Sequence, residues 1–302
     1  MSTIIGRITK GVGGLYFVDC GKESSLPCRA RGKFRRSGEC PQIGDLVKVE
    51  LADGSENIIC EILPRKNLLI RPPMANLDDL FIVLPTTSPT PDLQTIDKLS
   101  AIAVHDGITP YIVISKCALD PAAAEGYAEI YKKSGIPTIV TDAMCGIGID
   151  ELRETLYKRE GGRIAAFAGA SGVGKSTLLN ALYPKLSLET GSVSEKTERG
   201  RHTTRKVELF CDGDGYIADT PGFTMIDFVH FDFMDKDELR SAFPEFLPYI
   251  GDCRYRKCSH TKEEGCAIID AVKSGIIAKS RHDSYVSIYE DLKGKHDWDK
   301  KR

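Results

Sequence analysis

Short apolar runs open the chain, and their spacing is that of strands. Between residues 4 and 62, β-branched and aromatic residues alternate with polar ones, and Gly-rich turns separate the runs. Five short strands in about 65 residues predict a small barrel of the OB type. The expected strands are Ile4–Ile8, Leu15–Asp19, Ser25–Ala30, Asp45–Leu51 and Asn57–Ile62.

The pattern changes after residue 62. Pro64, Pro72 and Pro73 interrupt residues 63–80, which we interpret as a linker. Apolar runs of strand length then alternate with helical patterns, which predicts a parallel α/β sheet covered on both faces. The expected strands are Leu80–Leu84, Tyr111–Ser115 and Thr138–Thr141, and the expected helices are Asp92–His105, Ala122–Lys133 and Asp150–Lys158.

A phosphate-loop motif follows the next strand. The apolar run Ile164–Ala168 predicts a buried strand and Ser176–Leu182 a helix, and the spacing between them is G-x4-G-K-S. In such a loop, backbone N–H groups at a helix N-terminus surround phosphate oxygens. We expect a nucleotide to bind Gly169, Ala170, Ser171, Gly172, Val173, Gly174, Lys175, Ser176 and Thr177.

Two residues of this motif have expected chemical roles. Lys175 is expected to reach the β- and γ-phosphates and to act in catalysis, and the Ser176 hydroxyl to bind Mg²⁺. Downstream, Val207–Cys211 and Tyr216–Asp219 predict a hairpin that ends in the sequence Asp-Thr-Pro-Gly. Asp219, at the end of a strand, is a candidate Mg²⁺ ligand, and the Gly222 N–H can contact the γ-phosphate.

The polar stretch between loop and hairpin contains further candidates. Thr203 or Thr204 can supply a second hydroxyl to Mg²⁺ and so sense the γ-phosphate. His202, next to them, can position the attacking water. A plain exposed loop and a solvated histidine are the alternatives.

Near the C-terminus, four potential zinc ligands lie within 14 residues. Cys253, Cys258, His260 and Cys266 make the Cys₃His set of a closed tetrahedral site, which is typical of structural zinc. Free thiols beside a surface histidine are the alternative. Helices are expected at about 266–277 and about 280–293.

Composition limits the classes of function. With 302 residues, two or three domains are expected, and the formal net charge of −2 excludes a uniformly basic coat for nucleic acid. A local basic run remains, with Phe34 and Tyr16 as candidate stacking residues, and it indicates either a nucleic-acid face or a solvated loop. Its cations are Arg29, Arg31, Lys33, Arg35 and Arg36.

The N-terminus and the remaining cysteines indicate the compartment. No stretch approaches the roughly 18 apolar residues of a membrane span, and the first residues lack the apolar core of a secretion signal. The seven cysteines outside the cluster are scattered and expected to be reduced. We therefore expect a soluble cytoplasmic protein without a membrane partner.

Several segments together resemble the RsgA family (YjeQ and YloQ type), circularly permuted GTPases that assist assembly of the small ribosomal subunit. They are RARGKFR, GDLVKVE, PRKNLLIRPP, ANLDDLFIV, HTT, DTPG, FPEF at 243–246 and the Cys/His cluster. The resemblance implies GTP hydrolysis stimulated by the subunit, with Mg²⁺ and one structural zinc. It also implies contact with ribosomal RNA through the outer domains.

The base-reading segments depart from the family pattern. The segment Ser115-Lys116-Cys117-Ala118 stands where the family has N-K-x-D, and Asp142-Ala143 where it usually has Ser-Ala. Ser115 and Lys116 remain candidate nucleotide contacts, but Ala118 offers guanine no acceptor. Asp120 can take that place only if the loop is rebuilt. Three interpretations of the nucleotide site therefore stay open: it binds GTP, it binds any purine triphosphate, or it is vestigial in an RNA-binding factor.

The sequence thus predicts an α/β protein of three parts. These are an OB-like RNA-binding barrel at 1–66, a circularly permuted phosphate-loop GTPase domain at 67–228, and a helical zinc-knuckle domain at 229–302. The expected partners are GTP or GDP and the small ribosomal subunit with its rRNA, and the chain is expected to be a monomer.

Overall fold

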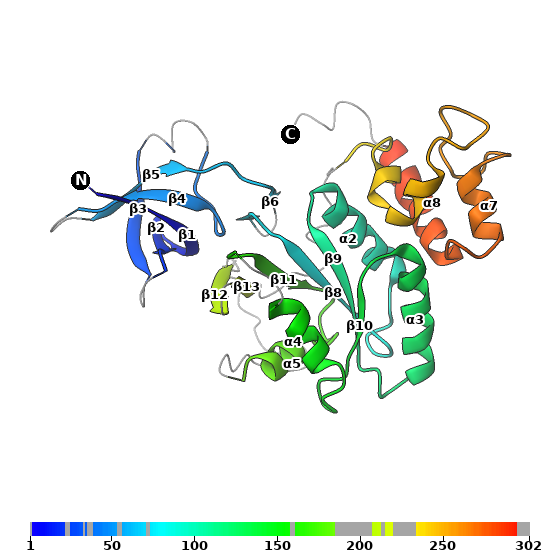
Figure 1. The fold of residues 1–302 in the computed structure, drawn as a ribbon, viewed down its shortest axis with the longest axis horizontal. Helices are drawn as coiled ribbons and strands as arrows, with labels where there is room; N and C mark the ends of the chain where they lie inside the picture. The colour runs from blue at the N-terminus through cyan, green and yellow to red at the C-terminus, as the bar shows by residue number, and fades with distance from the viewer. Residues whose placement is uncertain are drawn as a thin grey trace, which may run out of the picture. The chain divides into compact units, whose positions relative to one another are not determined.

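The computed structural model of the chain describes residues 2–21, 25–32, 34, 39–52, 56–70, 73–157, 161–184, 207–212, 215–219 and 234–294. The chain divides into two compact units (Figure 1). The first unit comprises Met1–Asp79, Leu156–Phe167 and Glu198–Phe223. The second comprises Leu80–Thr155, Ala168–Thr197 and Thr224–Arg302.

The first unit begins with a closed five-stranded barrel, which confirms the predicted OB-like fold. Its strands follow the order β1-β2-β3-β5-β4, and β1 pairs with both β2 and β4, so that the barrel has no free edge. Alternate residues such as Ile8, Val18 and Val47 point inward and are fully buried. The strands are β1 (Thr3–Val12), β2 (Leu15–Asp19), β3 (Leu26–Ala30), β4 (Leu46–Glu50) and β5 (Asn57–Ile62).

The proposed stacking role of Phe34 is wrong. Phe34 is only 5 % exposed and belongs to the barrel core, against which Tyr16 also packs. Two cations of the basic run have acidic partners, since Arg31 Nη2 lies 2.6 Å from Glu50 Oε2 and Arg29 pairs with Glu56. Lys33, Arg35 and Arg36 lie outside the described residues.

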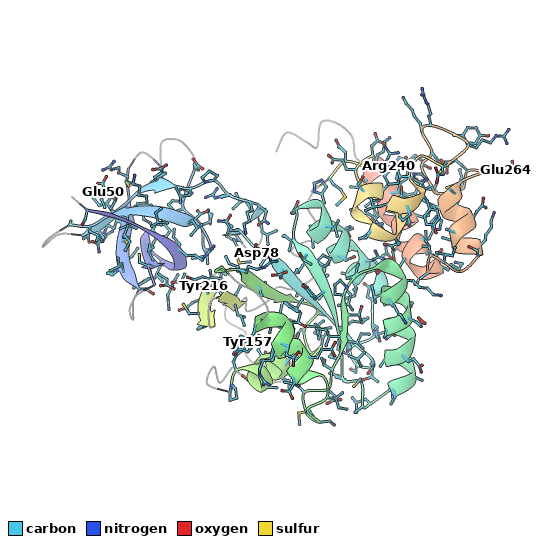
Figure 2. All side chains as sticks on the ribbon, in the orientation of Figure 1. Glu50, Asp78, Tyr157, Tyr216, Arg240 and Glu264 are labelled. Atoms are coloured by element: carbon cyan, nitrogen blue, oxygen red, sulfur yellow. The ribbon has the colours of Figure 1, made fainter. Side chains whose placement is uncertain are left out.

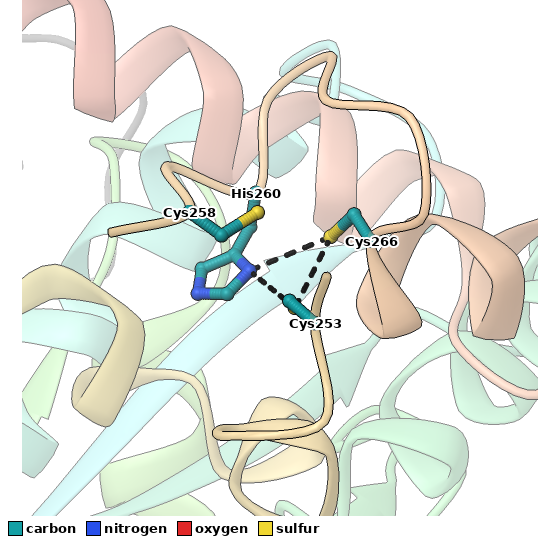
Figure 3. Close-up of side chains that lie close together, drawn as sticks. All are labelled: Cys253, Cys258, His260 and Cys266. Atoms are coloured by element: carbon teal, nitrogen blue, oxygen red, sulfur yellow. Dashed lines mark hydrogen bonds between the residues drawn. The ribbon is translucent and has the colours of Figure 1, made fainter. Parts of the chain in front are cut away.

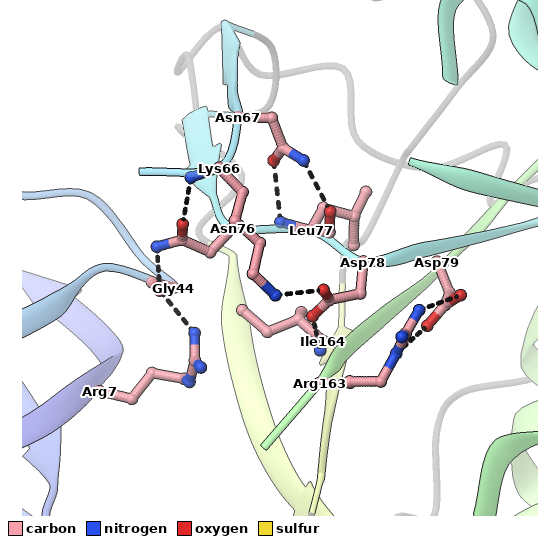
Figure 4. Close-up of polar contacts among 10 residues, drawn as sticks. All are labelled: Arg7, Gly44, Lys66, Asn67, Asn76, Leu77, Asp78, Asp79, Arg163 and Ile164. Atoms are coloured by element: carbon pink, nitrogen blue, oxygen red, sulfur yellow. Dashed lines mark hydrogen bonds and ion pairs between the residues drawn. The ribbon is translucent and has the colours of Figure 1, made fainter. Parts of the chain in front are cut away.

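The interpretation of residues 63–80 as a linker is also wrong. This segment forms a hairpin of β6 (Leu68–Ile70) and β7 (Pro73–Ala75), and Met74 and Leu77 are fully buried. The Asn67 side chain closes the hairpin, because it donates to the Leu77 carbonyl and accepts from the Leu77 N–H (Figure 4). Pro73 is tolerated since it stands at the first position of its strand.

Two aspartates tie this hairpin to the sheet strands of the first unit (Figure 4). Asp78 accepts from the Ile164 N–H at 2.9 Å and from Lys66 Nζ at 2.7 Å. Asp79 is fully buried and accepts from Nε and Nη2 of Arg163. These contacts fix the start of β11 (Ile164–Ala168), the strand that leads into the phosphate loop.

In the first unit, β11 is followed by the predicted hairpin, in the order β11-β13-β12. β13 (Gly215–Asp219) runs parallel to β11, and β12 (Glu208–Asp212) runs antiparallel to β13. The hairpin contacts the barrel through Tyr216, which is labelled in Figure 2. The Tyr216 hydroxyl donates to Asp19 at 2.9 Å, and Lys10 pairs with Glu208.

The second unit contains the predicted strand and helix alternation. Its strands follow the order β10-β9-β8, and all seven residues of β8 are buried, as expected for a strand covered on both faces. The strands are β8 (Asp79–Pro85), β9 (Thr109–Ser115) and β10 (Thr138–Val140), and the helices α2 (Leu93–His105), α3 (Pro121–Ser134), α4 (Ile149–Tyr157) and α5 (Lys175–Leu182).

Four further helical elements belong to the described part of the second unit. They are η1 (Leu239–Ala242), η2 (Pro244–Tyr249), α7 (Ala267–Lys273) and α8 (Lys279–Lys293). α8 packs against α2 and η1 (Figure 1). α7 ends earlier than predicted because Gly275 adopts a positive φ of 77°. Among the described helices, none has the length and apolar character that crossing a bilayer requires.

Candidate functional site

The phosphate-loop sequence adopts a conformation that only glycine accommodates easily. Gly169, Gly172 and Gly174 have φ values of 146°, 81° and 104°. A Cβ atom on Gly169 would lie 2.9 Å from the Val83 carbonyl oxygen. The loop leaves the buried strand β11 and enters α5 at Gly174, so the predicted strand, loop and helix are all present.

Lys175, the first residue of α5, folds back over this loop. Its Nζ donates to the Gly169 carbonyl at 2.7 Å and to the Ala170 carbonyl at 2.8 Å. Burial lowers the pKa of Lys175 to about 8. Among the described residues its hydrogen-bond partners are these two carbonyls. A half-buried cation in such surroundings favours an anionic ligand, because the ligand would stabilise the charged form. Ser176 and Thr177 are half-buried on the first turn of α5.

The base-reading segment is attached to the phosphate loop. Ser115 Oγ donates to the Val173 carbonyl at 2.7 Å, and this contact is buried. Lys116 has a positive φ of 60°, and its Nζ donates to the carbonyls of Gly172 at 2.8 Å and Ser88 at 2.5 Å. The structure therefore brings these two predicted contacts to the loop that follows β11.

Around Ala118, the structure rejects one candidate acceptor and reveals another. Ala118 is exposed, and Asp120 accepts from the Ala123 N–H at 3.0 Å as the N-cap of α3. Asp142 is only 5 % exposed, and its Oδ2 accepts from the Ala118 N–H at 3.2 Å. Sequence reasoning missed this residue, although an acid in place of the usual serine was a signal.

The remaining predicted nucleotide contacts are described only in part. His202, Thr203, Thr204 and Gly222 lie outside the described residues. Asp219 is the last residue of β13. Because β13 pairs in parallel with β11, Asp219 ends its strand on the edge of the sheet at which β11 also ends.

The four predicted zinc ligands lie together in the second unit (Figure 3). The ligand atoms of Cys253, Cys258, His260 and Cys266 all lie within 4.8 Å of one another. Cys258, His260 and Cys266 are buried, and Cys253 is partly exposed. Two buried thiols, a partly exposed third thiol and a buried imidazole thus meet at one point, and this donor set is one that Zn²⁺ prefers.

The distances fit a tetrahedral zinc site. Cys253 Sγ lies 3.8 Å from Cys266 Sγ, and His260 Nδ1 lies 3.5 Å from each of these sulfurs. Ligands at about 2.3 Å (sulfur) and about 2.0 Å (nitrogen) from a central Zn²⁺ are about 3.5–3.8 Å apart. The residues therefore fit the metal, with Nδ1 of His260 as the ligand nitrogen.

A cavity of about 280 Å³ lies beside this cluster. Four cations line it, together with one acid and two tyrosines. Its cationic residues are Lys236, Arg240, Arg256 and Lys257. Such a lining suits an anionic partner with flat rings, as in nucleic acid.

A glycine loop between a buried strand and a helix, with a lysine folded over it, defines the class of phosphate-loop nucleotide-binding proteins. Comparison with protein families gives the particular group. The family model RsgA GTPase matches residues 62–229, and the model RsgA N-terminal domain matches residues 5–59. The chain belongs to the RsgA GTPase family.

Curated relatives and solved structures agree with this assignment. The small ribosomal subunit biogenesis GTPase RsgA of Caldanaerobacter subterraneus is 40 % identical over 98 % of both chains, and that of Geobacillus kaustophilus is 40 % identical over 95 % of this chain and 97 % of the relative. YjeQ from Thermotoga maritima matches with a TM-score of 0.81 at 31 % identity, over 98 % of this chain and all of that structure. YloQ, described as a circularly permuted GTPase, matches with a TM-score of 0.77 at 31 % identity, over all of this chain and 97 % of that structure.

Proposed function

We propose that this chain hydrolyses GTP to GDP and phosphate during late assembly of the small ribosomal subunit. Relatives named for that role are 40 % identical over nearly the full chain. The phosphate loop is the observation that carries the proposal. It combines three glycines at positive φ with a half-buried lysine that, among the described residues, contacts carbonyl oxygens and no carboxylate.

In the proposed reaction, water attacks the γ-phosphate. Lys175 exchanges its two loop carbonyls for phosphate oxygens and neutralises negative charge there. Ser176 and Asp219 offer the oxygen donors that Mg²⁺ prefers. Mg²⁺, when bound with GTP, stabilises charge on the β- and γ-phosphates. The other loop residues donate backbone N–H groups to phosphate oxygens.

The polar segment before β12 supplies the remaining groups in this proposal. His202 positions the attacking water, Thr203 or Thr204 senses the γ-phosphate, and Gly222 donates its N–H to it. We expect His202→Ala to lower the hydrolysis rate about 10²-fold or more while leaving GDP affinity unchanged. Loss of GDP binding in this variant would contradict the proposed role.

The outer parts of the chain are proposed to contact the subunit. The proposed domains are the barrel at 1–66, the GTPase domain at 67–228 and the zinc domain at 229–302. The OB-like fold of the barrel and the cationic cavity beside the zinc cluster support the proposed contact with ribosomal RNA. The zinc ion holds the knuckle closed and has no catalytic position. The proposed setting is the cytoplasm, and the proposed form is a monomer.

Ala118 favours one other candidate, a triphosphatase that accepts any purine, because it offers the base no acceptor. Sedimentation with purified small subunits tests the assembly role in either case. We expect the chain to pellet with subunits in the presence of a non-hydrolysable GTP analogue and much less with GDP. Absence of binding in every nucleotide state would contradict the assembly role.

A further inference from the structure

A carboxylate lies beside Ala118 although residue 118 itself has none. Asp142 Oδ2 accepts from the Ala118 N–H at 3.2 Å. An aspartate at position 118 would hold its own carboxylate oxygens about 3–4 Å from the same nitrogen, given ordinary bond lengths. The acidic group therefore remains near the position that the N-K-x-D pattern gives it, but comes from a different segment.

The backbone fixes this arrangement. β9 and β10 are parallel, Ser115 is the last residue of β9, and Thr141 directly follows β10. The Thr141 N–H donates to the Ile114 carbonyl at 2.6 Å, and the Cys117 N–H donates to the Thr141 carbonyl at 3.2 Å. These bonds hold the segment after β9 against the segment after β10, so that Asp142 faces the backbone of Ala118.

The same segment is attached to the phosphate loop. Ser115 Oγ contacts the Val173 carbonyl, and Lys116 Nζ contacts the Gly172 carbonyl. A nucleotide with its phosphates on residues 169–177 would lie next to Gly172 and Val173, which these side chains contact. Asp142 is thus a buried acid beside the segment to which the family resemblance assigns base reading.

The hydrogen bonds of Asp142 leave one acceptor position open. Oδ1 accepts from the N–H groups of Met144 at 3.0 Å and Cys145 at 3.2 Å. Among the residues that the structure describes, Oδ2 accepts only from the Ala118 N–H. A carboxylate has about four lone-pair positions, so Oδ2 retains capacity for one more donor. A buried acceptor with spare capacity gains most from a donor supplied by a ligand.

We propose that Asp142 reads guanine by accepting its N1–H, in place of the acid that Ala118 lacks. The inference rests on the proposed GTPase function and specifies the base. Guanine presents an N1–H donor, whereas adenine presents a lone pair at the same ring position. A carboxylate attracts the first and repels the second, so one residue suffices to discriminate.

Asp120 does not compete for this role. Its carboxylate caps α3 through the Ala123 N–H, and Pro121 follows at the first helical position. Because asparagine caps a helix about as well as aspartate does, Asp120→Asn removes the same charge nearby at little cost in stability. This variant is therefore a matched control.

The test compares GDP and ADP affinities of the full chain and its variants by calorimetric titration with Mg²⁺. We expect the wild type and D120N to prefer GDP. We expect D142N to lose about ten- to a hundredfold in GDP affinity while its ADP affinity is unchanged or higher. The double variant A118D/D142S, which returns the acid to residue 118, should regain GDP preference and thereby separate a lost acceptor from a misfolded loop.

Two results would overturn the inference alone: equal GDP and ADP affinities in the wild type, or an unchanged GDP preference in D142N. A wild type that binds neither nucleotide would instead overturn the proposed GTPase function, and the inference with it. Loss of GDP preference in D142N together with its return in A118D/D142S supports the inference.

Discussion

Lys175 shows how a single residue prepares an anion site before the anion arrives. Its ammonium group is half-buried and contacts two carbonyl oxygens, and burial lowers its pKa to about 8. Nucleotide phosphates would favour the charged form again. Binding is therefore coupled to the protonation of this lysine.

This coupling predicts the direction of a pH effect on nucleotide binding. The free protein loses the Lys175 proton as the pH rises through about 8, and binding must then restore it. GDP affinity should fall about tenfold between about pH 7 and about pH 9. Calorimetric titration at both values measures this. The Lys175→Arg variant keeps its charge over this range, so its GDP affinity should not show the decrease that deprotonation of Lys175 causes. An equal decrease of GDP affinity in both proteins would contradict the explanation.

At the residue scale, the sequence predicted local chemistry better than it predicted tertiary contacts. The spacing of Gly169, Gly174 and Lys175 was sufficient to predict the loop, because the motif is contiguous. The burial of Phe34 and the contact of Asp142 with Ala118 depend on residues that only folding brings together. The acid at position 142 marked an unusual residue, but the sequence did not show which residue it would contact.

At the scale of elements, a buried ion network joins three helical segments of the second unit. Arg281 on α8 is fully buried, and it pairs with Asp97 of α2 at 2.8 Å and Glu245 of η2 at 2.7 Å. The Tyr131 hydroxyl of α3 also donates to Asp97. The charged residues lie far apart in the sequence, so their pairing could not be predicted from spacing within one helix.

Removing the cation should destabilise this part of the fold. Arg281→Met leaves two buried carboxylates without their partner, and we expect a loss of about 3–5 kcal/mol in unfolding free energy. Urea denaturation measures the loss. As a control on the same helix, Lys279→Ala breaks an exposed pair with Asp283 and should cost at most about 0.5 kcal/mol. Equal losses of unfolding free energy in the two variants would contradict a larger contribution of the buried network than of an exposed ion pair.

The zinc knuckle is a second element whose stability can be tested. Cys266 is 1 % exposed and belongs to the apolar cluster of the C-terminal helices. We expect Cys266→Ser to lose the metal and to increase proteolysis of residues 234–294, because a structural zinc contributes directly to folding. Zinc content per chain by atomic emission measures the first effect. Cys40→Ser changes an exposed cysteine and should keep its zinc, whereas full zinc content in Cys266→Ser would contradict the ligand assignment.

Element boundaries were predicted well where caps are explicit in the sequence. The sequence Asp120-Pro121 starts α3 and Gly135 ends it in a left-handed conformation, as the residue types predict. The hairpin β6–β7 was missed since its prolines resemble linker residues. What stabilises it is the pair of bonds from Asn67 to Leu77, which a linear pattern does not contain.

At the scale of the whole molecule, the chain is an RsgA-family GTPase whose barrel precedes the phosphate loop in the sequence and whose Cys₃His cluster follows it. The phosphate loop, Asp142 and the cationic cavity have separate proposed roles, toward phosphates, the base and RNA respectively. The proposed function requires that these parts act together on the small subunit.

Phosphate release from GTP and from ATP, each with and without purified small ribosomal subunits and with Mg²⁺ present, tests that requirement most directly. We predict slow release from GTP alone, clear stimulation by subunits, and little release from ATP in either condition. Absence of release from GTP in the presence of subunits, by a folded chain with its zinc bound, would contradict the account.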